Sequence, residues 1–277
     1  MTSPRQAFNE LVTEAVDDLA RHGFDSASRV SVWLERLRVA ARRALVPEDV
    51  LQEQLTRTLG ATYRRLVDRG SILARHPGVS RFTLERVRPR LRAELDRRVA
   101  ASANLIRLNR EEAIETTLRR FSGWASSVPP GGSEATASAE AKDAVRKPLQ
   151  SLPFRERRVA IDQGAKFVAT LNEILADDAG ALAAEWHSRF RVPGYDYRED
   201  HKERDEVVYP IRDSWAHQRG LVKVGPDGWY DQVTKPGEEV FCRCSCRYIY
   251  RLASLPEALL TEKGKAALAQ GVERRTA

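Results

Sequence analysis

The chain has three cysteines, and all of them lie in one short segment, residues 236–251. Cys242, Cys244 and Cys246 occupy every second position there, with arginine or serine between them. A β-strand directs successive side chains to opposite faces, so this spacing predicts a half-buried strand with the thiols on its apolar face. Thiols serve as metal ligands, as nucleophiles or as small core hydrophobes.

Geometry bears on the first of these roles. Residues two apart on a regular strand are roughly 6.6 Å apart, whereas two thiolates on one tetrahedral zinc must approach to about 4 Å. A bulge could bring Cys242 and Cys244 together, and His201 or His187 could supply a further ligand. The candidate metal ligands are therefore Cys242 and Cys244 with His201 or His187, and zinc is the metal considered. Reduced core thiols and a redox or catalytic use stay open beside it, while the parallel side chains disfavour a disulfide between near neighbours.

A second group of polar side chains lies at residues 198–205, where charges of both signs alternate around His201. An imidazole titrates near neutrality and can act as a ligand or as a general base. The signatures of phosphate-binding loops, dinucleotide-binding turns, zinc proteases and serine hydrolases are missing from the sequence. We therefore predict a protein without catalytic residues that is not an enzyme, with a metal-dependent enzyme centred on His201 as an alternative.

Positive charge is concentrated in residues 51–100, which hold twelve arginines and five acidic residues in a chain of net charge +7. Arg86, Arg90 and Arg97 lie within about 40° of one another on a helix of 100° per residue, which predicts a basic ridge. Such a ridge can contact nucleic acid or an acidic partner. It can equally be a solvated helix face, so DNA binding is a second functional hypothesis.

The elements that must position these residues form three predicted regions. Residues 1–127 show helical periodicity and predict a helical domain. Residues 128–150 begin with a segment rich in Pro, Gly, Ser and Ala, which predicts a flexible linker. Residues 151–277 predict a long helix that leads into a small antiparallel sheet, with a hairpin at 221–230 and the cysteine strand closing the sheet. The fold class is α+β.

Composition limits the class of protein. The chain has 277 residues, a hydrophobic content of 42% and a mean hydropathy of -0.49. No apolar run approaches the roughly 20 residues of a membrane-spanning helix. We expect a soluble protein without a secretory signal, made in a reducing cytoplasm.

Several short motifs between residues 186 and 244 occur in a characteristic order. They are Trp186-His187-Ser188, then Arg198, His201 and Asp205, then Pro236-Gly237-Glu238, and then Cys242-Arg243-Cys244. Together they resemble the C-terminal domain of phage head morphogenesis proteins, the Mu F-like minor head proteins. Two features depart from that family: Glu206 stands where it commonly has Gly, and a Cys pair near the Trp is missing.

The resemblance implies a structural minor capsid protein that acts in procapsid assembly or DNA packaging near the portal. Portal and capsid proteins are the implied partners, packaged double-stranded DNA is a further contact, and no membrane is involved. The implied location is the virion head, after synthesis in the cytoplasm of a bacterial host. No cofactor is expected, with zinc as the open alternative.

Overall fold

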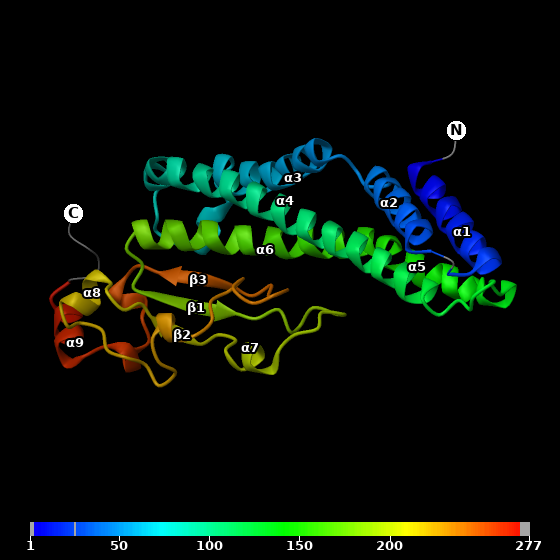
Figure 1. The fold of residues 1–277 in the computed structure, drawn as a ribbon. Coiled ribbons are helices and arrows are strands. Elements are labelled where there is room, and N and C mark those ends of the chain that lie inside the picture. The colour runs from blue at the N-terminus through cyan, green and yellow to red at the C-terminus, as the bar shows by residue number, and fades with distance from the viewer. Residues whose placement is uncertain (1–2, 25, 272–277) are drawn as a thin grey trace. The chain divides into compact units, whose positions relative to one another are not determined.

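The computed structural model describes residues 3–24 and 26–271, and it confirms the predicted α+β class (Figure 1). Long helices account for most of the described chain, and the sheet lies in its C-terminal part. The helices are α1 (Pro4–His22), α2 (Ala27–Arg43), α3 (Glu48–Tyr63), α4 (Arg81–Ala125), α5 (Ala139–Gln150), α6 (Leu152–Asp178), α7 (Glu199–Glu203), α8 (Trp215–Gln218) and α9 (Glu262–Ala269). The strands are β1 (Ala183–His187), β2 (Val208–Pro210) and β3 (Ser245–Ile249).

The described chain forms two compact units, each built from two separate segments. The first unit is made of the residues up to 55 and residues 100–160, and the second of residues 56–99 and those from 161 onward. The chain therefore passes between the units within α3, α4 and α6. These limits differ from the predicted domains 1–127 and 151–277, because helical periodicity continues through each crossing and gives no sign of a boundary.

The predicted linker, residues 128–150, is structured in its second half, where α5 lies. Val145 and Leu149 of α5 are buried in the apolar core of the first unit. A Cβ atom on Gly132 would lie 2.5 Å from the carbonyl oxygen of Ala20, so this position requires glycine for close packing. The small residues that predicted flexibility allow the segment to pack against α1 instead.

The second unit contains the antiparallel sheet, in the order β2–β1–β3. Trp186 of β1 pairs with Cys246 of β3, and Ala184 pairs with Tyr209 on one side and Tyr248 on the other. Residues from the two faces of the sheet belong to different buried clusters. One contains Trp186, Cys246 and Tyr248, and the other contains Leu182, Ala183 and Leu252.

Two strand predictions are wrong in detail. The cysteine strand begins only at Ser245, so Cys246 alone of the three cysteines lies within β3. Residues 221–230 do not form a two-stranded ladder: the predicted turn is present, with an isolated antiparallel bridge between Gly225 and Gly228, but Val222 makes its bridge to Leu260. The side chain of Gln232 accepts a hydrogen bond from the N–H of Trp229 at 2.8 Å, and this turns the chain where a second strand was expected.

A fully buried histidine, His76, lies in the core of the second unit. Its Nε2 is 3.0 Å from Oδ1 of Asn172, and its Nδ1 is 2.6 Å from the hydroxyl of Tyr250. A neutral ring satisfies both contacts by donating to the amide oxygen and accepting from the phenol. Burial, followed by the positive charge of Arg75, lowers the pKa of His76 to about 4, although the contact with Asn172 opposes this shift.

We expect the free energy of unfolding to fall as the pH drops below about 6.5, because the unfolded chain binds a proton at His76 before the folded chain does. The contribution is complete above that pH and is lost towards about pH 4, and its size is about 3 kcal/mol. Urea unfolding across this range should show a shallower pH dependence for His76→Gln than for the parent chain. Parallel curves would contradict the assignment.

Candidate metal centre

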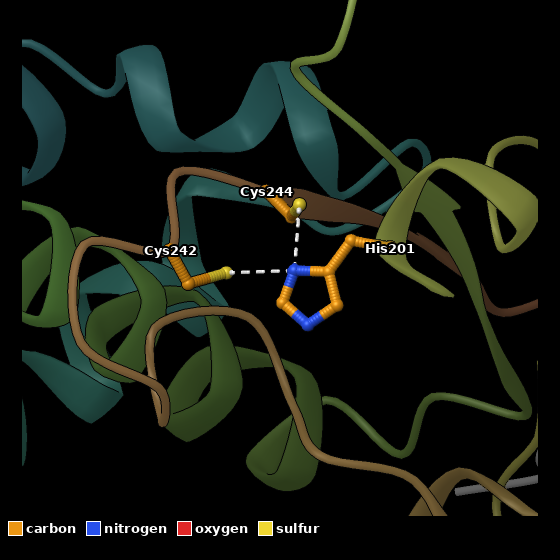
Figure 2. A group of neighbouring side chains, drawn as sticks. All are labelled: His201, Cys242 and Cys244. Atoms are coloured by element: carbon orange, nitrogen blue, oxygen red, sulfur yellow. Dashed lines mark hydrogen bonds between the residues drawn. The ribbon is translucent and has the colours of Figure 1, made fainter. Parts of the chain in front are cut away.

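Two thiols and one imidazole meet in the second unit. Nδ1 of His201 lies 3.7 Å from Sγ of Cys242 and 3.6 Å from Sγ of Cys244 (Figure 2). The ligand atoms of the three residues all lie within 4.8 Å of one another, and the side chains are buried. The structure thus confirms that His201 lies beside these two cysteines.

Irregular backbone before β3 makes this approach possible. Phe241 has a φ of 62°, in the left-handed region, and this turns the chain just before Cys242. The N–H of Phe241 donates to Oδ1 of Asp162 on α6 at 2.6 Å, which fixes the turn. Because Cys242 and Cys244 precede the strand, the spacing of a regular strand does not separate their sulfur atoms.

The turn at residues 236–238 supports the same loop. Gly237 has a φ of 84°, and a Cβ atom there would lie 3.0 Å from Cβ of Ala169 on α6. Pro236 is buried, and the carboxylate of Glu238 accepts a hydrogen bond from the N–H of Lys235 at 2.7 Å. The three residues therefore set the path of the chain into the cysteine segment.

A carboxylate lies on the far side of the His201 ring. Oε2 of Glu239 is 3.1 Å from Nε2 of His201, and the guanidinium of Arg198 is 3.0 Å from the same oxygen. Arg198 also donates to the carbonyl of Val240 at 3.0 Å. A negative charge beside Nε2 favours a proton on that nitrogen, which leaves the lone pair of Nδ1 facing the two thiols.

Neither Nε2 of His201 nor Oε2 of Glu239 makes a well-aligned hydrogen bond within the described chain. Both atoms are buried, and such atoms are normally paired. Metal-bound histidines commonly donate their second ring nitrogen to a carboxylate. The His201–Glu239 pair therefore fits a metal site in which the carboxylate accepts from the histidine nitrogen that does not bind the metal.

Other motif residues hold the surrounding segments. The ring of Trp186 packs edge-on against His201, with centroids 5.3 Å apart. Oδ1 of Asp205 accepts a hydrogen bond from the N–H of Ser188 at 2.7 Å, which fixes the chain after β1. Glu206 has a φ of 68° and donates its N–H to the carbonyl of Trp186 at 2.8 Å.

The two clustered thiols differ in acidity. A hydrogen bond from Cys244 lowers the pKa of Cys242 to about 6, against the effect of burial and with help from the N–H of Gly237. The bond to Cys242, together with burial, raises the pKa of Cys244. Burial raises the pKa of Cys246 to about 12, so that thiol stays neutral in the core. Cys242 and Cys244 thus share one proton in the absence of a cation.

Two thiolates and an imidazole form a donor set suited to zinc, which binds sulfur and nitrogen in a tetrahedral arrangement. A metal ion would displace the shared proton and satisfy the lone pair on Nδ1 of His201. His187 does not belong to the cluster: its ring is 3.6 Å from the carboxylate of Glu185 instead. Three protein ligands leave one tetrahedral position for a water molecule or another donor.

The predicted basic ridge lies elsewhere in the second unit, on α4, and carries acidic partners. Arg86 is 2.6 Å from the carboxylate of Asp178, and Arg90 is 3.5 Å from the same residue. Arg97 is 2.5 Å from Glu94. The charge of the ridge is therefore partly neutralised, and its contact with nucleic acid or with a partner stays a prediction. Asp178 lies at the end of α6, so the helical spacing within residues 81–125 could not indicate the pairing.

Two residues of the centre were missed by sequence reasoning, Asp162 and Glu239. Glu239 follows the Pro-Gly-Glu turn directly, and the acidic pair at 238–239 is the only hint of it in the sequence. Asp162 lies on a helix far from the cysteines along the chain. Its role depends on packing of α6 against the loop and has no local signature.

Among the described residues, no helix combines the length and the apolar character that crossing a bilayer requires. Comparisons with protein-family models, curated proteins and solved structures find no match to the chain.

Proposed function

We propose that this chain is a structural minor protein of a phage head, acting in procapsid assembly or DNA packaging near the portal. The observation that carries the proposal is the convergence of separate motifs. Trp186, His201, Cys242 and Cys244 come from segments up to 58 residues apart and form one buried cluster. An ordered set of motifs that builds a single small module is what the resemblance to Mu F-like head proteins implies.

Glu206 adds independent support. The family commonly has glycine at this position, and here the residue adopts a left-handed conformation with a φ of 68°. That conformation favours glycine over residues with a Cβ atom. The backbone requirement thus agrees with the family pattern even where the side chain departs from it.

The test is co-expression with the capsid and portal proteins of the phage or prophage that carries the gene, followed by sedimentation of the assembled particles. We expect the chain to sediment with procapsids and to be absent from shells assembled without the portal. Normal procapsids that never contain the chain would overturn the proposal. A gene flanked only by metabolic genes would also count against it.

We further propose that Cys242, Cys244 and His201 bind zinc, which closes the loop before β3 onto α7. This role is structural and requires no catalysis. It replaces the shared proton and the thiol contacts of Nδ1 of His201 by coordinate bonds in a buried site.

Glu239→Gln should weaken zinc binding by about 10- to 100-fold, because the neutral amide no longer stabilises the proton on Nε2 of His201. Competition against a chromophoric chelator measures the affinity. Glu238→Gln is the matched control, since its side chain is exposed and its amide oxygen can still accept from Lys235. Equal affinities for the two variants would exclude the role given to Glu239.

A further inference from the structure

A cavity of about 410 Å³ in the second unit has five basic side chains in its lining. Residues of α6 and β3 contribute to its walls. Its charged residues are Arg65, Arg75, Arg189, Arg243, Lys235 and Glu173. Glu173 is the acid among them, and it is already paired with Lys235.

The four arginines lack acidic partners within the part of the chain that the structure describes. The guanidinium of Arg243 lies over the ring of Tyr195, 5.5 Å from its centroid, which leaves the charge uncompensated. Arg75 is half-buried and makes no side-chain hydrogen bond among the described residues. Arg65, Arg189 and Arg243 are exposed, so only Arg75 is partly removed from water, and a cationic group in that position is normally paired.

Repulsion within the cavity is visible at Arg75. Burial lowers the pKa of Arg75, and the positive charges of Arg189 and, more weakly, Arg65 lower it further, against the opposing effects of Tyr248 and Cys246. The like charges therefore destabilise one another, and an anion between them would relieve both the repulsion and the missing hydrogen bonds.

The arrangement differs from the basic ridge on α4. Arg86, Arg90 and Arg97 each have a carboxylate within 3.5 Å. The cavity thus gathers four arginines that have no acidic partner among the described residues, and it lies away from the ridge that helical spacing selects.

We propose that this cavity binds a phosphate group. Guanidinium groups offer pairs of parallel N–H donors that match the oxygens of phosphate. Several guanidinium groups around one anion supply more N–H donors than the two oxygens of a carboxylate can accept, which favours phosphate as the anion. The phosphate could be free or could belong to a polynucleotide backbone. The two sources present the same chemistry to the arginines and are separated by experiment.

The test titrates the full chain with pyrophosphate by calorimetry and, separately, with a short labelled DNA duplex by fluorescence anisotropy at low salt. The double variant Arg65→Gln with Arg75→Gln should bind whichever probe the parent chain binds at least about tenfold more weakly. Arg69→Gln with Arg247→Gln is the matched control, because it removes the same charge from exposed sites outside the cavity. It should retain the affinity to within about twofold.

Binding of pyrophosphate alone identifies a site for a free phosphate compound, and binding of the duplex alone identifies a backbone contact. Absence of binding of both probes, or equal losses of affinity in the two double variants, would overturn the proposal.

Phenylglyoxal modification of the unaltered chain gives a second readout that needs no variant. Pyrophosphate or the duplex should protect Arg75 and Arg189, and unchanged modification would also overturn it. Zinc content is measured in parallel, so loss of the metal is not mistaken for loss of the phosphate site.

Discussion

Cys244→Ala should abolish zinc binding and remove the stabilisation that zinc gives to the second unit. A ligand at a thousandfold excess over its dissociation constant stabilises the folded state by about 4 kcal/mol. We expect zinc to raise the unfolding free energy of the parent chain by this amount, which appears as a higher midpoint of thermal unfolding. The midpoint of Cys244→Ala should stay unchanged when zinc is added. With a chelator present, the unfolding free energies of the two proteins should differ only by the packing contribution of the missing sulfur atom.

Cys246→Ala is the control for this experiment. Its thiol is as buried as the other two, but it lies within β3 and outside the cluster of ligand atoms. The variant should lose some stability through the cavity it creates and should keep its full response to zinc. Cobalt substitution gives a second readout, because thiolate coordination produces intense absorption that Cys246→Ala should retain. A parent chain that is well folded and binds neither metal would end the metal proposal.

The sequence predicts the partners of this centre better than it predicts the backbone that brings them together. Alternating cysteines at 242, 244 and 246 predict one continuous strand, and in such a strand the sulfur atoms are too far apart for a shared metal. The left-handed residue Phe241 and its hydrogen bond to Asp162 change that geometry. A positive φ at a phenylalanine has no signature in the local sequence, so the irregular segment could not be predicted.

The limits of the compact units were missed for a related reason. Periodicity reports which face of a helix is buried, and it stays regular in α4 while the helix passes from one unit to the other at residues 99 and 100. The small residues at 128–141 were interpreted as flexible, whereas Gly132 is needed for close approach to Ala20. Long-range contacts of this kind decide whether a glycine marks flexibility or tight packing.

Trp186→Ala should cost about 3–5 kcal/mol of unfolding free energy, because the largest fully buried side chain among the described residues would be replaced by a cavity. The same change removes the edge that packs against His201 and the ring beneath the guanidinium of Arg204, 5.3 Å from its centroid. Zinc affinity should therefore fall together with stability, since the imidazole loses a wall of its site. Urea unfolding followed by circular dichroism and the chelator competition give the two values.

Trp186→Phe separates packing from hydrogen bonding at this position. Nε1 of Trp186 is buried and has no hydrogen-bond partner within the described residues, so removing it relieves an unsatisfied donor worth about 1–3 kcal/mol. That gain offsets part of the cavity left by the smaller ring, and we expect Trp186→Phe to be clearly more stable than Trp186→Ala and to bind zinc. Trp229→Ala, which removes a half-buried indole outside the centre, should leave the zinc affinity unchanged. If Trp186→Ala lost stability without any loss of zinc affinity, the indole would belong to the core alone and would not position His201.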